Sequence, residues 1–199
     1  MKRYALCLLA LFVLPAQADP ALITAARGQV GVTVIYDPSY QSLRFPGGDV
    51  APERGVCTDV VIRALREAWG IDLQLATNRD MKAAFSAYPK TWGMKTTDRN
   101  IDHRRVPNLQ TLLRRVGAAL PDSTDASAYR PGDIVTWMLP GNLPHIGILS
   151  DKMAGDHPLV LHNIGAGARE EDRLFDFPIT GHYRLNDAAR ARLQTLGRP

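Results

Sequence analysis

The hydrophobic periodicity of this 199-residue chain changes partway along, and that change limits the folds open to it. Helical spacing of apolar residues predicts helices at 21–30, from Val56 to near Gly70, at 78–88 and at 107–120. From Asp133 onward, extended apolar runs predict strands at 133–139, 145–150, 159–163 and 179–185, before a last helix at 187–196. Helices followed by strands with short turns indicate an α+β fold, in which N-terminal helices pack on an antiparallel sheet.

The first eighteen residues have the features of a signal peptide rather than of a folded domain. Lys2 and Arg3 precede an apolar run from Tyr4 to Leu14, and Ala16-Gln17-Ala18 is typical of a cleavage site. We therefore expect a signal peptide at 1–18 and a single domain at 19–199, exported to the periplasm. A second stretch of about 18 apolar residues is lacking, so we expect no stable membrane insertion.

The charge balance of the exported part is close to neutral. Without Lys2 and Arg3, the 24 basic residues become 22, against 20 acidic residues. A net charge this small, with dispersed basic residues, does not favour nucleic acid as a partner.

Cys57 would be the only cysteine after signal cleavage, since Cys7 lies in the apolar run. Exported proteins usually pair their cysteines, so an unpaired thiol calls for an explanation. One explanation is simple core packing, because free cysteines are often buried. The other is chemistry: a thiol in the first turn of a helix can have its pKa lowered from about 8.5 to about 3.5–7.5.

A nucleophilic thiol needs a base, and the base needs a residue that orients it. His145 opens one expected strand and His162 lies near the end of the next. If these strands pair, both rings reach one sheet edge beside Cys57, and Gly147 would leave room for the helix to approach. Taken singly, each histidine is also consistent with a structural role.

Several runs in the sequence resemble a known superfamily. These are Arg54-Gly55-Val56-Cys57-Thr58-Asp59-Val60-Val61, Pro131-Gly132-Asp133-Ile134-Val135, Pro144-His145-Ile146-Gly147-Ile148 and Val160-Leu161-His162-Asn163. Their order is similar to that of the NlpC-type cell-wall cysteine peptidases, which have a papain-like core. Three further runs resemble the YijF-like family, exported bacterial proteins of unknown function placed in that superfamily: Tyr36-Asp37-Pro38, Pro46-Gly47-Gly48-Asp49 and 100–108.

The resemblance implies roles for individual residues. Cys57 would be the nucleophile, His145 the general base and then the general acid, and His162 the orienting residue. Asn163 would replace His162 if the strand register slipped by one residue. Tyr36 or Tyr40 would be the tyrosine that helps bind the oxyanion. Where these enzymes often have Asp-Cys-Ser, this chain has Val56-Cys57-Thr58-Asp59, so their substrate contacts do not transfer.

The resemblance also implies a substrate. We expect a cysteine amidase or endopeptidase that acts on peptidoglycan or other envelope-derived peptides through an acyl-enzyme, with no cofactor and no metal. The candidate substrate-binding residues are Tyr36, Tyr40, Asp59, His103, Arg104 and Arg105. The arginine pair would hold a carboxylate at the wall of a groove formed with the Pro- and Gly-rich loop 37–55. The alternative for 102–105 is a solvated loop in which Asp102 pairs with Arg104 or Arg105.

Two other function classes stay open. The same dyad suits an acyl transferase or an esterase. Cys57, His145 and His162 would alternatively serve as metal ligands in a non-catalytic envelope protein, although their wide spacing and the helix-terminal thiol favour nucleophilic attack.

Overall fold

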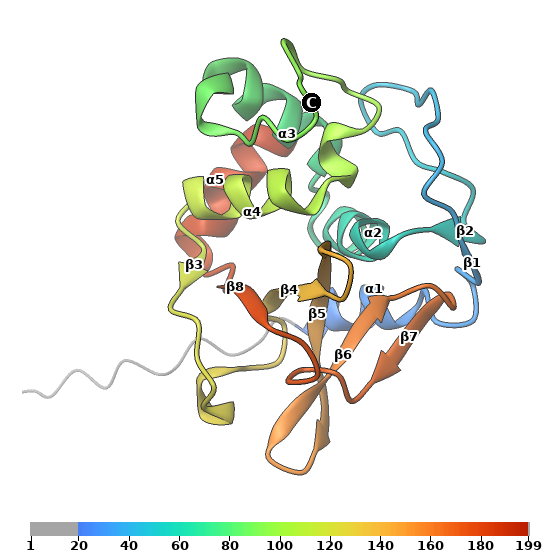
Figure 1. Ribbon diagram of the computed structural model, residues 1–199, viewed down its shortest axis with the longest axis vertical. Coiled ribbons are helices and arrows are strands. Elements are labelled where there is room, and N and C mark those ends of the chain that lie inside the picture. Colours follow the sequence, from blue (N-terminus) through green and yellow to red (C-terminus); the bar gives the residue numbers. More distant parts are fainter. Residues whose placement is uncertain (1–19, 199) are drawn as a thin grey trace, which may run out of the picture.

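A computed structural model describes residues 20–198 of the chain. It is a mixed α+β structure in which helices pack on one face of an antiparallel sheet, as the sequence predicts (Figure 1). The expected signal peptide at 1–18 lies outside the described residues. No helix in the described part is long and apolar enough to cross a bilayer.

The five α-helices are α1 (Pro20–Arg27), α2 (Cys57–Trp69), α3 (Leu73–Ala83), α4 (Val106–Arg115) and α5 (Asp187–Gly197). Three expected helix boundaries are wrong by five residues, one of them the end of α3, which lies at Ala83 and not at 88. Helix α3 begins five residues earlier than the expected start at 78, because the Asp72 side chain accepts hydrogen bonds from Gln74 N and Leu75 N and so caps the helix. Helix α4 stops before 120, because Gly117 has φ +84° and residues 119–120 turn into a strand.

The main sheet has six strands in the order β3-β8-β4-β5-β6-β7. Their bounds are Ala119–Leu120, Ile179–Tyr183, Ile134–Leu139, Leu143–Ala154, His157–Asn163 and Ala168–Glu171. The expected strands β4, β5 and β6 are successive antiparallel neighbours, and the fourth expected strand, β8, pairs with the other side of β4. Strand β7 follows β6 at one edge and β3 lies at the other; neither was expected, because both are short and have little apolar patterning.

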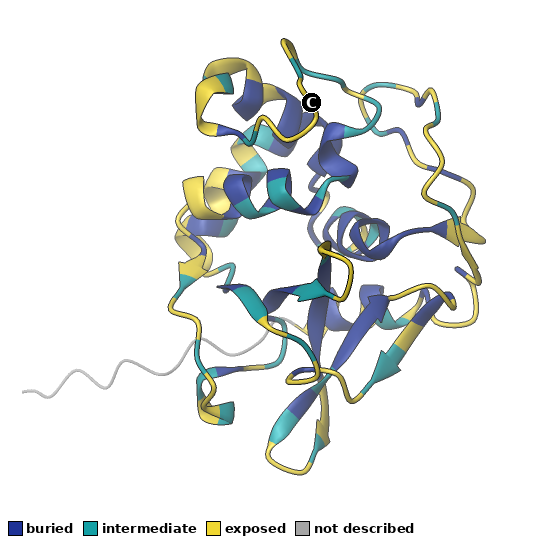
Figure 2. Ribbon diagram, in the orientation of Figure 1, coloured by how far each residue is buried: buried dark blue, intermediate teal, exposed yellow. Residues whose placement is uncertain are grey.

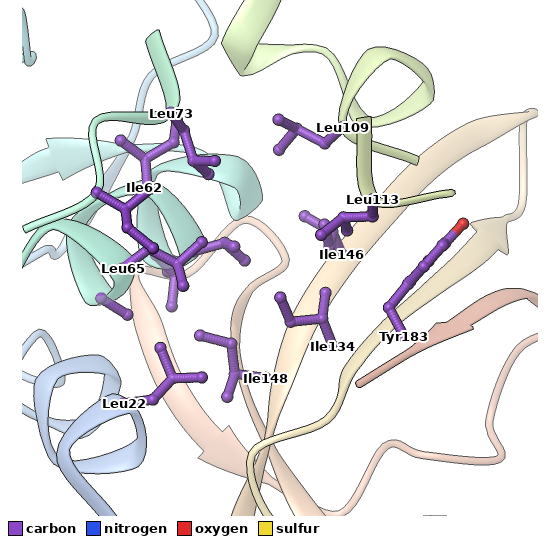
Figure 3. Packing of buried hydrophobic residues seen from close by; sticks show 14 of the residues in the cluster. Leu22, Ile62, Leu65, Leu73, Leu109, Leu113, Ile134, Ile146, Ile148 and Tyr183 are labelled. Atoms are coloured by element: carbon purple, nitrogen blue, oxygen red, sulfur yellow. The ribbon is translucent and has the colours of Figure 1, made fainter. Parts of the chain in front are cut away.

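Each face of the sheet has its own hydrophobic cluster. The larger one joins α1, α2 and α4 to the sheet, and Figure 3 shows Ile146 and Ile148 of β5 facing Leu65 of α2 and Leu113 of α4. The smaller cluster covers the other face and includes Trp137, Leu149 and Val160. Figure 2 shows α2 and the central strands as the most continuously buried elements. The candidate site therefore lies on the rigid part of the molecule.

Residues 37–53, which we call the strap, contain no helix or strand, as the Pro and Gly content predicts. The strap is bounded by β1 (Ile35–Tyr36) and β2 (Arg54–Gly55), which pair in parallel. Arg63 of α2 holds it by donating to the Asp49 carboxylate and to the carbonyl oxygens of Val50 and Ala51. Arg63 thus pairs with the strap and not with Asp59, four residues before it on α2, since Asp59 faces inward.

Candidate functional site

Cys57 is the first residue of α2 and is 5% exposed. The helix start has no Ser, Thr, Asn or Asp at its N-cap; instead the Asp59 carboxylate accepts a hydrogen bond from Val56 N at 2.7 Å. Burial raises the pKa of the Cys57 thiol to about 12, against the opposing effect of the backbone N–H groups of Ile146, Thr58 and Cys57 itself. The expected depression of this pKa is therefore wrong for the resting structure, because desolvation outweighs the helix terminus.

A chain of three side chains crosses the neighbouring strands β5, β6 and β7. His145 Nε2 lies 2.8 Å from His162 Nδ1, and His162 Nε2 lies 3.3 Å from a carboxylate oxygen of Glu171. The ionised carboxylate accepts only, so His162 donates through Nε2, its Nδ1 accepts, and His145 donates through Nε2. We call this chain the histidine relay. It leaves Nδ1 of His145 without a proton and able to act as a base.

Burial of the relay disfavours its charged form. The rings of His145 and His162 are 3% and 2% exposed. Burial, followed by the charge of His162, lowers the pKa of His145 to about 3. The pKa of His162 is also lowered by burial, against the opposing effect of Glu171. The thiol and both imidazoles are accordingly neutral at pH 7.

The relay and the start of α2 meet through the residues next to the histidines. The backbone N–H of Ile146, which follows His145, lies close enough to the Cys57 thiol to act on its pKa. Asn163, which follows His162, donates its Nδ2 to the Gly55 carbonyl oxygen at 3.1 Å. Within residues 20–198, no hydrogen bond joins the thiol to either ring. Catalytic hydrogen bonds are often long before substrate binds.

The structure distinguishes the two candidates for the orienting residue. The ring of His162 is hydrogen-bonded to that of His145. The Asn163 side chain instead donates a hydrogen bond to the Gly55 carbonyl oxygen and accepts one from the Gly165 N–H. The sequence suggested that Gly147 leaves room for the helix, and this is wrong. A Cβ added at Gly147 would instead meet atoms of β6, namely Val160 Cγ1 at 2.8 Å and His162 Cβ at 3.1 Å. The absent side chain makes room for His162 itself.

The two candidate tyrosines differ in position. Burial, then the charges of Cys57 and Asp59, raises the pKa of the Tyr36 hydroxyl to about 12. Tyr36 therefore stays a neutral donor in the electrostatic reach of the thiol. Tyr40 is 59% exposed and its hydroxyl donates to Asp98 at 3.0 Å. The arrangement favours Tyr36 over Tyr40 beside Cys57.

Arg104 has a different environment from the one expected. Its guanidinium is buried in an ion pair with Asp59, at 3.0 Å, and it also donates to the carbonyl oxygens of Asp37 and Ser39 in the strap. Arg104 thus ties α2, the strap and the short 3-10 helix at Asp102–Arg104 together. The expectation that Arg104 and Asp59 bind substrate is corrected, because each satisfies the other inside the protein.

The neighbours of Arg104 also turn inward. His103 is 2% exposed, and burial followed by the charges of Arg104 and Arg66 lowers its pKa to about 3. Arg105 pairs with Asp102 at 3.4 Å and stacks on Trp92, with its guanidinium carbon 4.2 Å from the ring centroid. Only Arg105 and Trp92 of this group reach the surface. The expected pair of Asp102 with Arg105 is thus present, but the segment is a buried 3-10 helix and neither a solvated loop nor a free arginine pair.

Glu171 is the member of the site that sequence reasoning missed. Strand β7 has the sequence Ala-Arg-Glu-Glu, which lacks an apolar alternation, so nothing marked it as part of the sheet. The register pairs His162 with Arg169 and places Glu171 two residues further on.

In the described range 20–198, no cluster of three His, Cys, Asp or Glu side chains is arranged to hold a metal ion.

The fold and the site define an α+β protein with a buried thiol at a helix start and a histidine pair on adjacent antiparallel strands. Residues 23–185 match the family described as DUF1287, a domain of unknown function, and the chain belongs to that family. It is 53% identical over 170 residues to the uncharacterized protein YijF of Escherichia coli strain K12, which covers 85% of this chain and 82% of YijF. The resemblance to YijF-like proteins is thus confirmed.

Proposed function

We propose that the protein is an exported cysteine hydrolase with an NlpC-type, papain-like core, which cleaves amide bonds of peptidoglycan through an acyl-enzyme on Cys57. The observation that carries the proposal is the histidine relay. A carboxylate, an orienting histidine and a base histidine in one hydrogen-bonded chain fix a single tautomer, and that tautomer presents a basic nitrogen. A histidine pair with only a packing role would not need this polarity.

The proposed reaction begins from neutral groups. As Cys57 Sγ attacks the carbonyl carbon of the scissile amide, its proton passes to Nδ1 of His145. The raised pKa of the thiol and the lowered pKa of His145 favour this concerted transfer over a preformed thiolate and imidazolium pair. His145 then gives the proton to the departing amine as the C–N bond breaks. A water molecule next attacks the thioester, which releases the carboxylic acid and restores the thiol.

Two donors suit the oxyanion that forms on the carbonyl oxygen. The backbone N–H of Cys57 lies at the start of α2, where main-chain N–H groups lack helical acceptors. Tyr36 is the second candidate, because its hydroxyl stays protonated across the physiological range. Removing one such donor typically lowers kcat by about 100- to 1,000-fold.

The substrate class rests on two supports outside the relay. Residues 1–18 have the pattern of a signal peptide, which would deliver the protein to the periplasm. The motif order resembles that of cell-wall peptidases, and the substrates of those enzymes are amide bonds in peptidoglycan stems.

The test is mass spectrometry of purified peptidoglycan after incubation with the protein and with its Cys57→Ala variant. We expect new fragments that carry a free amine and a free carboxylate, formed by the wild-type protein alone. Transfer to an added amine acceptor in place of water would identify an acyl transferase. Identical digests from both proteins, with the wild type folded, would overturn the proposal.

A further inference from the structure

We propose that a pocket between α3 and residues 94–100 binds a carboxylate group of the peptide that the protein acts on. The inference rests on the proposed function and adds a recognition site for one part of the substrate. The pocket has a volume of about 560 Å³ and is lined by Phe45, Asn78, Lys82 and residues 94–100.

The pocket has an excess of unpaired positive charge. Lys82, Lys95 and Arg99 line it and are exposed, and none of them forms an ion pair within residues 20–198. The one carboxylate in the lining, Asp98, accepts hydrogen bonds from Asn100 N at 2.9 Å and from the Tyr40 hydroxyl at 3.0 Å. Asp98 forms no ion pair with any of the three cations, and the lining keeps an excess of two positive charges.

A polar residue of α3 lines the same pocket. Asn78 is only 4% exposed as a residue, and its amide is open to the pocket rather than sealed in the core. It precedes Lys82 by four residues on α3, which places both side chains on one helix face. An amide that both donates and accepts, next to ammonium groups, suits a peptide group and its carboxylate.

Hydrogen bonds hold the pocket wall to the strap. The Oδ1 of Asn100 accepts a hydrogen bond from the backbone N–H of Leu43, and its Nδ2 donates one to the Tyr40 hydroxyl. Gln74 of α3 donates to the carbonyl oxygens of Arg44 and Arg99. The pocket is thus a formed feature of the described structure, built on α3 and the strap.

The strap also links the pocket to the candidate site. Tyr40, which is hydrogen-bonded to Asp98 and Asn100 of the pocket lining, follows Tyr36 by four residues, which span at most about 14 Å. Tyr36 lies within electrostatic reach of Cys57. A peptide of several residues with its scissile amide at Cys57 can therefore extend toward the pocket. This placement supplies the positive charge that Arg104, being buried, does not offer.

The test measures binding to the Cys57→Ala protein, which cannot turn substrate over. The probes are a synthetic peptidoglycan stem tetrapeptide with free carboxylates and the same peptide with its carboxylates amidated. The variants are Lys82→Gln/Lys95→Gln and, as a control, Arg130→Gln, an exposed arginine outside the pocket whose side chain forms no ion pair within the described range. Thermal denaturation checks that each variant is folded.

We expect the double variant to raise the Kd of the free-acid peptide by about tenfold, from two charge contacts worth up to about fivefold each. Amidation should raise the Kd of the unchanged pocket by a similar factor, and should have little effect on the double variant. The control should bind within about twofold of the parent. Inorganic phosphate at equal concentration should not displace the peptide.

Equal binding of both peptides by both proteins would overturn the inference, as would displacement by phosphate without discrimination against the amidated peptide. The proposed function fails separately. If wild-type protein cleaves stem peptides with a KM that the double variant leaves unchanged, the hydrolase stands and the pocket assignment falls. If the pocket binds the peptides as expected but no peptide is cleaved, the pocket assignment stands and the hydrolase proposal falls.

Discussion

At the scale of single residues, the site is defined by the direction of its hydrogen bonds. Glu171 determines which nitrogen of His162 carries the proton, and His162 does the same for His145. Each ring is too buried to be re-oriented by water. The base nitrogen thus depends on a carboxylate two strands away from the first residue of the relay.

The relay predicts a graded loss of activity. His145→Ala should lower kcat by about 100- to 10,000-fold, because it removes the proton acceptor. His162→Ala and Glu171→Gln should cost less, since they release the ring orientation while the base remains. Steady-state kinetics on stem peptides would measure this order. Equal, small losses from His145→Ala and His162→Ala would contradict the assigned roles.

The thiol pKa predicts slow alkylation. With a pKa of about 12, only about one Cys57 in 100,000 is a thiolate at pH 7, compared with about 3% of a simple thiol. Iodoacetamide labelling of Cys57, followed by peptide mass spectrometry, should be at least 100-fold slower than that of glutathione. The rate should rise about tenfold for each pH unit between pH 7 and pH 10.

The control is the same protein in denaturant, where labelling should match the simple thiol. Fast labelling of the folded protein at pH 7 would mean that the helix terminus outweighs burial, as the sequence alone had suggested.

At the scale of elements, the Asp59–Arg104 ion pair joins three segments. It connects the first turn of α2, the strap and the 3-10 helix before α4, with both side chains under 5% exposed. Removing one partner leaves a buried charge without compensation.

Asp59→Asn or Arg104→Met should therefore lower the free energy of unfolding by about 3–5 kcal/mol. The double variant Asp59→Asn/Arg104→Met should lose less than the sum of the two, by at least about 1 kcal/mol. Urea denaturation of the wild type, the two single variants and the double variant measures the four free energies of unfolding, from which the interaction energy of Asp59 and Arg104 follows. As a matched control, Lys152→Gln, which breaks the pair of the exposed Lys152 with Glu170, should cost less than about 1 kcal/mol. Strict additivity at Asp59 and Arg104 would argue that they do not interact.

The packing of β5 against β6 predicts an effect at Gly147. Gly147→Ala should destabilise the protein by about 1–3 kcal/mol, because the new methyl group meets Val160 Cγ1 at 2.8 Å. It should also displace His162 and lower activity. Gly28→Ala is the control, since its added Cβ has no contact closer than 3.5 Å. Circular dichroism melting curves would compare them, and a neutral Gly147→Ala would show that the strands can separate.

At the scale of the whole molecule, buried titrating groups set the acid sensitivity. His103 and His145 have pKa values lowered to about 3, so protonation favours the unfolded chain. Their stabilisation is complete above the unfolded pKa of about 6.5 and decreases below it. Asp102, with a pKa raised to about 6, acts in the opposite sense, because its protonated form favours the folded state between about pH 4 and 6.

His103 and His145 favour proton uptake on unfolding and Asp102 opposes it, while His162, with its pKa lowered, and His157, with its pKa raised, act in opposite senses. The result is a net uptake of about one proton on unfolding. The free energy of unfolding should thus fall by about 1.4 kcal/mol per pH unit from pH 6 to pH 4. His103→Gln should reduce that slope to near zero, whatever its effect on the stability at pH 7. Urea titrations at several pH values would measure both slopes. A slope that His103→Gln leaves unchanged would assign the acid sensitivity to other groups.

The fold was predictable where periodicity and side-chain chemistry agreed. The strongly apolar α2, β4, β5 and β6 were predicted within a few residues, although β5 extends four residues past its expected end. The irregular structure of the strap was also predicted. Edge strands β3 and β7 were not, because both are short and their exposed sides carry no apolar pattern; β3 in addition pairs with β8, which lies far away in sequence. A turn glycine and an Asp cap decided the boundaries that were missed.

The site was predictable in its residues and less so in its electrostatics. Cys57, His145 and His162 lie at elements that the sequence marked, and the structure brings the two rings together. Burial is a property of the assembled molecule, so the direction of the Cys57 pKa and the inward turn of Arg104 could not be deduced from the sequence. Glu171 depends on the register of an edge strand.

That edge strand has one more consequence, which concerns association between molecules. An open sheet edge offers free N–H and C=O groups to the sheet of a neighbouring molecule, and such edges promote aggregation. Here one edge is the two-residue β3, and the other is β7, which carries Arg169, Glu170 and Glu171. Short length protects the first edge and charge protects the second. Neutralising Glu171 would therefore weaken the barrier to edge-to-edge pairing as well as the orientation of His162.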